Sequence, residues 1–192
     1  MKEVIVTGAC ENDQSFKEHL NHLEKGALYL QDLGYFSLES FQVMDKAGSY
    51  FISRYLFPTK IFNEKDEPIH LLETLKKTNG LFSRWVRIGS KAKRAVRLIA
   101  QRLEPSDYEK RLRKLHKSAN KKGRAPTPAM LELARWSIYI TNAPEEMCPA
   151  QYLHLLYSWR WQKEFALKDK YRKKGRATYQ KLMDATGQAV LI

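Results

Sequence analysis

The stretch Gly26-Ala-Leu-Tyr-Leu-Gln-Asp-Leu-Gly-Tyr-Phe-Ser37 decides the fold class of this 192-residue chain. Residues 27–31 are mostly apolar and stop at Asp32, which predicts a short strand followed by a turn at 33–36. Asp32 is therefore expected at the carboxyl end of a sheet strand, where α/β folds place reactive groups. The same residue, two positions before Gly34, also fits plain turn chemistry, because Asp side chains bond to the backbone of turns.

Regular elements are predicted on both sides of this stretch. Residues 37–47 predict a helix that ends at Gly48, and residues 50–55 predict another strand. Upstream, residues 3–7 predict a strand, and a helix is expected after it that runs to about Lys25. The order strand, helix, strand, helix, strand is typical of a mixed α/β sheet with helices packed on it.

The pattern changes between Pro58 and Pro128, where short alternating segments predict a β-rich insertion that also carries a basic helix. Within this segment we expect strands at 82–88 and 95–103 and a helix at 108–119. After Pro128 we expect a helical turn at 131–134, a strand at 136–141 and a helix that begins at Pro149.

The charge of the chain is divided unevenly between its two parts. Residues 1–79 hold 9 Lys/Arg and 12 Asp/Glu, whereas residues 80–192 hold 25 and 9. The stretch 84–124 alone carries 15 basic and 3 acidic residues. A strongly basic half favours a polyanionic partner, because each neutralised phosphate releases condensed counterions. Nucleic acid is the first expectation, and an acidic membrane surface is less well supported because no amphipathic apolar stripe accompanies the charges.

Other classes of protein are excluded by composition. No apolar run approaches the roughly 18 residues of a membrane span, so no membrane partner is expected. The first residues lack the apolar region of a signal peptide. Cys10 and Cys148 show no metal-ligand spacing and no second pair, which fits a reduced, cytoplasmic compartment.

The segment Tyr157-Ser-Trp-Arg-Trp-Gln-Lys-Glu-Phe-Ala-Leu-Lys168 carries the most chemistry. On a helix, one face of this segment collects four polar side chains: Tyr157, Arg160, Glu164 and Lys168. The positions around that face are largely aromatic or aliphatic, so it is not the pattern of a solvated helix surface. A carboxylate beside two cations fits a site that holds a metal ion together with phosphates.

At this point the sequence resembles a known family, the bacterial insertion-sequence transposases of the DDE class, and in particular the insertion-sequence-four group. Three stretches carry the match: Gly26 to Ser37, Gly48-Ser-Tyr-Phe-Ile-Ser-Arg54, and Tyr139-Ile-Thr-Asn142 followed by 157–164. The signature of that group reads Tyr-x2-Arg-x3-Glu-x6-Lys, and its first three members match here at the right spacing. The resemblance covers residues 1 to about 168 and implies a ribonuclease-H-like core, interrupted by a β-rich insertion between the second Asp and the Glu helix.

The resemblance also implies roles for single residues. Asp32 would be the second and Glu164 the third metal-binding carboxylate, holding Mg²⁺ or Mn²⁺ for the cutting and joining of DNA phosphodiester bonds. Tyr157 and Arg160 would contact the transposon end, and Lys168 would stand near the position of the signature's Lys, which is Tyr171 here. Two alternatives stay open: a core phenol at Tyr157 and an ion pair between Arg160 and Glu164.

The first catalytic Asp of the family has no counterpart here, because residues 1–13 resemble the segment that follows its strand. The expected domains are 1–57 for the first part of the core, 58–135 for the basic insertion, 136–170 for the return to the core, and 171–192 for a basic tail that need not be ordered. We therefore expect a transposase segment that binds double-stranded DNA but neither nicks nor joins it alone.

Two other functions fit the same sequence features. The chain could be a non-catalytic DNA-binding remnant that regulates a full-length transposase, or an RNA-binding protein, although no RNA motif supports the second. A homodimer, or a mixed dimer with a full-length transposase, is an expected partner arrangement. The expected location is the bacterial cytoplasm, in association with the nucleoid.

Overall fold

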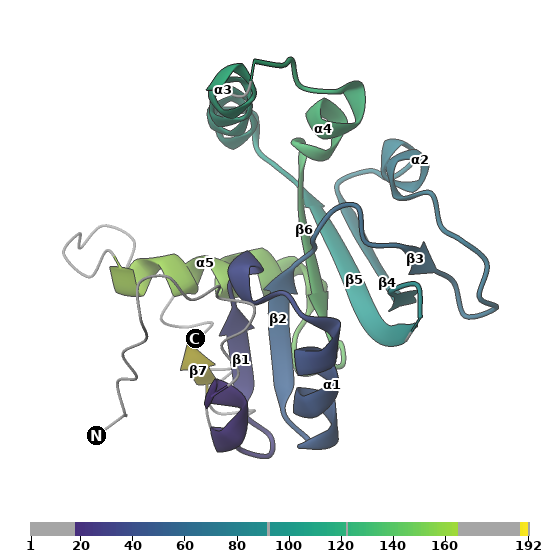
Figure 1. Cartoon of the computed structure of the whole chain (residues 1–192), viewed down its shortest axis with the longest axis vertical. Coiled ribbons are helices and arrows are strands. Elements are labelled where there is room, and N and C mark those ends of the chain that lie inside the picture. The colour runs from purple at the N-terminus through teal and green to yellow at the C-terminus, as the bar shows by residue number, and fades with distance from the viewer. Residues whose placement is uncertain (1–17, 92, 122, 165–188, 192) are drawn as a thin grey trace.

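The computed structural model describes residues 18–91, 93–121, 123–164 and 189–191. In these residues the fold is built on one seven-stranded sheet with the order β3-β4-β5-β6-β2-β1-β7 (Figure 1). β1 runs parallel to both of its neighbours, and all other neighbouring pairs are antiparallel. The strands are β1 (Leu28–Gln31), β2 (Tyr50–Arg54), β3 (Ile61–Phe62), β4 (Leu81–Ile88), β5 (Arg94–Arg102), β6 (Trp136–Thr141) and β7 (Ala189–Leu191).

Helices cover both faces of the part of the sheet that contains β1 and β2. The helices of the described chain are the short 3-10 helices η1 (Glu18–His22) and η2 (Leu33–Tyr35), and the α-helices α1 (Leu38–Lys46), α2 (Leu71–Lys76), α3 (Pro105–Lys121), α4 (Pro128–Leu133) and α5 (Ala150–Glu164). Of these, α1 and α5 cover the two faces at β1 and β2, whereas α2, α3 and α4 lie beside the other strands (Figure 1). α1 packs on one face of the sheet, where Phe41 stacks on Phe51 with ring centroids 4.3 Å apart. α5 packs on the opposite face, where Leu153 and Leu156 join the apolar cluster of β1 and β2.

The ends of α1 follow from its sequence. Ser37 caps the helix, because its side chain accepts a hydrogen bond from the backbone N–H of Ser40. Gly48 stops the chain after the helix with a φ of 69°, a left-handed conformation that glycine adopts without a Cβ penalty. The chain can then turn back into β2, which pairs with β1 residue by residue from Leu28 and Tyr50 onward.

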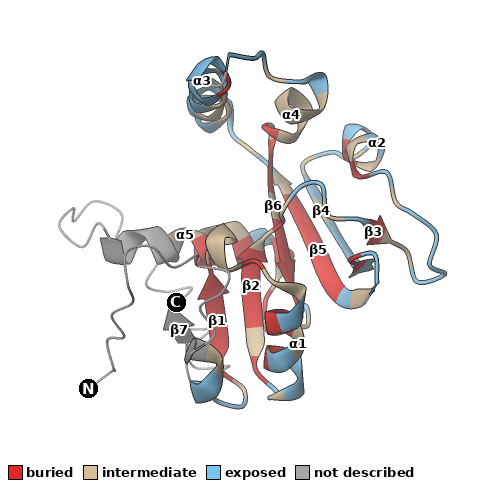
Figure 2. Ribbon diagram, in the orientation of Figure 1, coloured by how far each residue is buried: buried red, intermediate tan, exposed pale blue. Residues whose placement is uncertain are grey.

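The structure confirms the mixed α/β fold class. β1, α1, β2 and β6 occur where the sequence predicts them, within one residue at most boundaries. The burial pattern agrees, since the strands of this part of the sheet are the most buried elements (Figure 2). The predicted strand at 3–7 and most of the helix that follows it lie outside the described residues.

The segment 58–135 contains more helix than a β-rich insertion suggests, because α2, α3 and α4 accompany β3, β4 and β5. Its strands extend the sheet of the core, since β5 pairs with β6 over six residues. The expected tail also contains a strand, β7, which pairs with β1. The ribonuclease-H-like description and the domain boundaries stay predictions.

Candidate functional site

Asp32 follows directly on the last residue of β1, as the sequence predicts. Its side chain caps η2, with Oδ1 accepting a hydrogen bond from the backbone N–H of Leu33 at 2.6 Å. The residue is only partly buried, in contrast to Gln31, which is fully buried. Asp32 therefore combines turn chemistry with a position at the carboxyl end of a parallel strand, so the two interpretations of this residue are compatible.

α5 carries the signature residues and contacts the strand end at which Asp32 lies. Tyr157 is 2% exposed, and its hydroxyl donates a hydrogen bond to the backbone carbonyl of Gln31 at 3.1 Å. The face of α5 that carries Tyr157 is therefore directed at the end of β1. Burial in the apolar cluster also favours the open alternative of a core phenol, with a hydroxyl held by the backbone.

For Arg160 and Glu164, the other two signature residues, the structure describes the backbone only. α5 extends to Glu164, so the backbone of Arg160 and Glu164 is helical and continues the helix that carries Tyr157. Glu164 lies seven residues beyond Tyr157, which is about two turns and close to the same azimuth. The side chains of Arg160 and Glu164, and the whole of Lys168, lie outside the described part of the structure.

A hydrogen-bonded aromatic pair lies beside Tyr157. The hydroxyl of Tyr139 on β6 is 2.6 Å from Nδ1 of His154 on α5, and the rings of Tyr139 and Tyr157 lie 5.0 Å apart. Burial lowers the pKa of His154, and the nearby charge of Arg111 lowers it further. A neutral imidazole can accept the hydrogen bond of Tyr139, whose own pKa is raised by burial.

Two arginines lie near the same aromatic pair. Arg54 ends β2 and is paired in register with Tyr139. Arg111 extends from α3 and donates hydrogen bonds to the carbonyl of Trp136 and to Oγ of Ser137. Burial lowers the pKa of Arg111, and the charge of Arg54 contributes in the same direction. The two positively charged side chains thus lie at the carboxyl end of β2 and at the beginning of β6.

Sequence reasoning did not single out Tyr139, His154, Arg54 or Arg111 as members of a common site. A signal existed only for Arg54, because it lies near the end of the predicted strand 50–55, and the carboxyl ends of neighbouring strands meet at one edge of a sheet when the strands are parallel, as β1 and β2 are. Arg111 and His154 come from helices whose contacts depend on tertiary packing.

The beginning of α5 is held by a buried charge. Arg97 in β5 is 2% exposed, forms an ion pair with Glu145 and donates a hydrogen bond to the carbonyl of Cys148. Glu145 also accepts a hydrogen bond from the backbone N–H of Ala150, the first residue of α5, at 2.8 Å. One carboxylate therefore joins the first turn of α5 to β5.

The side chains of Asp32 and Glu164 are of the type that binds a hard metal ion, because carboxylate oxygens are the ligands that Mg²⁺ prefers. Asp32 offers such a group at the strand end, and the backbone of α5 reaches Glu164. Within the described residues, no three His, Cys, Asp or Glu side chains are grouped as a metal site would need. The third group of the implied site, the Glu164 carboxylate, belongs to the side chains that are not described.

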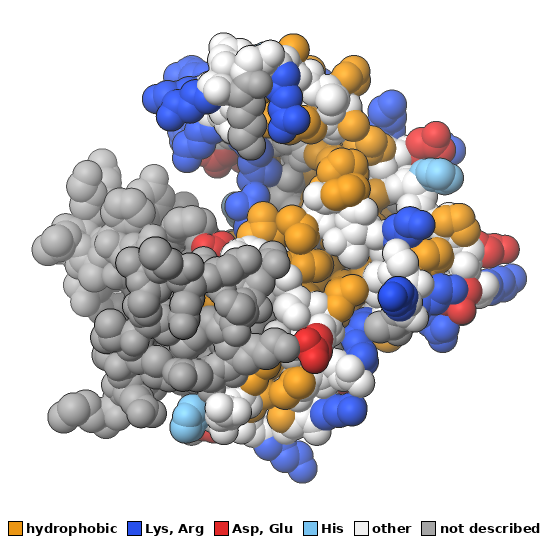
Figure 3. Space-filling view, in the orientation of Figure 1, with side chains coloured by type: hydrophobic (Ala, Val, Ile, Leu, Met, Phe, Trp, Pro, Cys, Tyr) orange, Lys and Arg blue, Asp and Glu red, His pale blue; other side chains and the backbone are white. Residues whose placement is uncertain are grey.

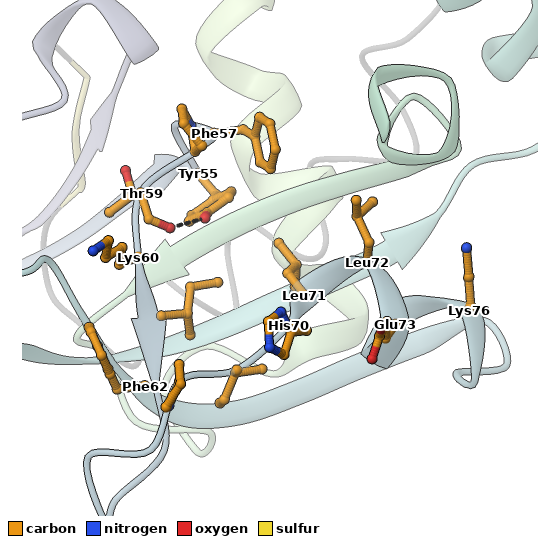
Figure 4. Close-up of a pocket in the computed structure, with 14 residues that line it drawn as sticks. Tyr55, Phe57, Thr59, Lys60, Phe62, His70, Leu71, Leu72, Glu73 and Lys76 are labelled. Carbon is orange, nitrogen blue, oxygen red and sulfur yellow. Dashed lines mark hydrogen bonds between the residues drawn. The ribbon is translucent and has the colours of Figure 1, made fainter. Parts of the chain in front are cut away.

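A separate cavity of about 660 Å³ lies between the segment after β2 and α2 (Figure 4). Its lining is mostly apolar, with Phe57, Ile61 and Leu71 among its members and Lys60 and Lys76 at its rim. The site residues predicted from the sequence are absent from its lining. Among the described helices, none has the length and apolar character that crossing a bilayer requires.

A strand-end Asp, a helix with the Tyr-x2-Arg-x3-Glu spacing and a mixed sheet are the features that the sequence resemblance leads one to expect of a DDE transposase domain. The chain belongs to this family: the model of the transposase DDE domain matches residues 3–192. The chain is 32% identical over 177 residues to the transposase for insertion sequence element IS231F of Bacillus thuringiensis subsp. israelensis. It is 27% identical over 193 residues to the transposase for IS1151 of Clostridium perfringens.

These alignments include most of this chain but less than half of each relative. The match to the IS231F transposase covers 82% of the chain and 37% of the relative, and the match to the IS1151 transposase covers 85% and 41%. The chain thus spans about two fifths of the length of these relatives. No solved structure matches it.

Proposed function

We propose that this chain forms part of the catalytic domain of a transposase that cuts and joins DNA during transposition, with Asp32 and Glu164 as two of its metal-binding carboxylates. The observation that carries the proposal is the hydrogen bond from Tyr157 to the carbonyl of Gln31, because it joins the signature helix to the strand end at Asp32. The family membership of the chain supports the same assignment.

In this proposal the metal is Mg²⁺ or Mn²⁺, held by Asp32 and Glu164. The bound ion would activate a water or a 3′-hydroxyl and stabilise the leaving oxygen of a phosphodiester. Asp32 would be oriented by its bond to the N–H of Leu33, which fixes one carboxylate oxygen. Arg160 and Lys168 would contact phosphates of the transposon end, with Arg160 suited to bidentate pairing. Tyr157 would act mainly by holding α5 against β1.

The chain alone is proposed to bind double-stranded DNA without cutting or joining it. The resemblance to the family implies a first catalytic Asp on an earlier strand. The described neighbours of β1 are β2 and β7, and neither contains Asp or Glu. A site with two of three carboxylates should bind metal weakly, since loss of a ligand removes both charge and coordination.

Calorimetric titration of Mn²⁺ tests the metal assignment. We expect weak binding by the unaltered chain, and a loss of at least tenfold in affinity in both Asp32→Asn and Glu164→Gln, since each removes a charged ligand. Asp45→Asn, which changes an exposed carboxylate on α1, is the matched control and should titrate like the unaltered chain. Equal binding by all four proteins would refute the roles of Asp32 and Glu164.

Strand transfer with Mg²⁺ or Mn²⁺ on a matching transposon end tests the inactivity. We expect no joined product from the chain alone. Product that appears and is abolished by Glu164→Ala would contradict the proposed inactivity while supporting the metal role of Glu164. We also propose that the chain associates with a second copy of itself or with a full-length transposase, and that it is found with the nucleoid. Light scattering of the chain, with and without a full-length transposase, measures the association between proteins.

A further inference from the structure

α3 has the most uneven distribution of charge among the described helices. It contains six Lys or Arg and two Asp or Glu in 17 residues. Figure 3 shows Lys and Arg side chains gathered over α3 at the top of the molecule. The sequence locates these charges in one segment, but only the packing of the helix decides which of them face solvent.

Five of the six cations form a single row, which we call the basic stripe of α3. At about 100° per residue, the positions of the row fall within about 100° of one another. All five residues are exposed: Lys110, Arg113, Lys114, Lys117 and Lys121. From first to last the row extends about 16 Å along the helix axis.

The opposite side of α3 packs on the protein, which fixes the direction of the basic stripe. Ala119 is buried on that side, and Leu112 and Leu115 are partly buried. Tyr108 lies under the guanidinium of Arg135, 5.1 Å from ring centroid to Cζ. Arg111, at the border of the two sides, is fixed by its bonds to Trp136 and Ser137. The stripe therefore cannot turn inward without breaking these contacts.

Two members of the basic stripe form ion pairs within α3, and these pairs are weak competitors for binding of a phosphate. Lys110 lies 2.9 Å from Asp107, and Arg113 lies 3.4 Å from Glu109, and all four side chains are well exposed. Exposed pairs of this kind contribute little free energy, because water screens them and two long side chains must be ordered. Phosphates can therefore replace the two carboxylates at low cost.

We propose that the basic stripe of α3 binds the phosphate backbone of duplex DNA, independently of base sequence. This inference rests on the proposed function and assigns it a surface. Five cations in one exposed row fit a polyanion with closely spaced charges, because each contact releases counterions. Arg111 contacts the first residues of β6, and the charge of Asp107 affects the pKa of His154, so α3 begins beside the candidate site.

A membrane surface is the less favourable partner for this helix. A helix that lies in a membrane interface inserts its apolar side between lipids. In α3 that side is occupied, since Ala119 is buried and Tyr108 is covered by Arg135. Only the charged side is available, and a duplex needs no more than that.

The test is the salt dependence of duplex DNA binding by the full chain, measured by fluorescence anisotropy between 50 and 200 mM salt. The variant replaces four members of the stripe, as K110Q/R113Q/K114Q/K117Q. We expect the slope of log K against log salt to fall by about 3 to 4, because each lost phosphate contact removes about 0.9. The drop in affinity over this salt range should then be roughly 100-fold smaller than for the unaltered chain.

A control variant separates a specific surface from general charge. K46Q/K60Q/K65Q/K77Q removes the same charge from exposed lysines of other elements and should reduce the slope by less than 1. Equal slopes for the two variants would overturn the inference, while a chain that does not bind duplex DNA at all would instead refute the proposed function. Tighter binding to RNA, or to vesicles that contain phosphatidylserine, with loss in the stripe variant, would overturn the assignment to DNA.

Discussion

Arg97 carries a charge that the fold has removed almost completely from water. Its guanidinium depends on the carboxylate of Glu145 and on the carbonyl of Cys148 for compensation. Glu145 is half-exposed, so its charge remains partly solvated when the ion pair is broken, whereas the charge of Arg97 does not. Removing one partner of such a pair costs more than replacing the buried charge by an apolar side chain.

We predict that Glu145→Gln lowers the free energy of unfolding by about 2 kcal/mol, because the charge of Arg97 stays buried and unpaired. Arg97→Met should cost less, since it removes the charge itself. Urea denaturation measures both. Glu146→Gln is the matched control, because the neighbouring carboxylate is exposed and affects Arg97 only through its charge. A cost for Glu146→Gln equal to that for Glu145→Gln would contradict this account of the ion pair.

His154 gives the fold a dependence on pH. Its pKa is lowered in the folded state, so the unfolded chain binds a proton more readily as the pH falls below about 6.5. The contribution of His154 to the free energy of unfolding should be fully present above that pH. It should decrease as the pH falls from there to the pKa of His154 in the folded state. We predict that His154→Gln flattens the unfolding free energy between pH 7 and pH 5, whereas His70→Gln, at an exposed position, leaves the slope unchanged. An unchanged slope in His154→Gln would refute this role.

Among the elements, the contact between α1 and the end of β4 leaves no room for a side chain. Gly89 follows β4 with a φ of 92°, and a Cβ built there would lie 2.4 Å from Cδ1 of Leu38, the first residue of α1. Gly80, before β4, has a similar φ of 82° but open space around it. The two glycines therefore separate backbone strain from crowding.

We predict that Gly89→Ala lowers the free energy of unfolding by about 2 to 3 kcal/mol, from backbone strain together with displacement of Leu38. Gly80→Ala should cost about 1 kcal/mol, from the backbone alone. Chemical denaturation of both variants measures the difference. Equal costs would show that Leu38 moves aside freely and that α1 is not tightly packed against this turn.

Over the whole molecule, the sheet unites segments that the sequence separates. β6 pairs with β5 of the insertion on one side and with β2 of the core on the other. Leu98 and Ile140, both fully buried, face each other across the first of these pairs. Within the described residues, the segment 58–135 and the strands β1, β2 and β6 consequently share one apolar cluster.

We predict that the chain unfolds in a single transition in which circular dichroism and tryptophan fluorescence coincide, as expected for one cooperative unit. Leu98→Ala should lower the free energy of unfolding by about 2 to 5 kcal/mol and shift both signals together. Two separated transitions, with only one of them shifted by Leu98→Ala, would show that the insertion folds independently of the core.

The sequence by itself determined the local structure and the family. Short, mostly apolar runs predicted β1, β2 and β6, and Ser37 and Gly48 predicted the ends of α1, because strands and helix caps depend on neighbouring residues. The resemblance to the transposase family rested on the Tyr157, Arg160 and Glu164 signature together with the stretches 26–37 and 48–54, all of which can be read along the chain.

The tertiary structure decided what depends on contacts between distant segments. It placed the hydroxyl of Tyr157 on the carbonyl of Gln31, 126 residues earlier, and it joined the insertion to the core sheet through β5 and β6. It also buried Arg97, gathered Arg54 and Arg111 near one strand end, and left the basic stripe of α3 exposed. Such features follow from strand order and helix packing, which no local pattern of residues specifies.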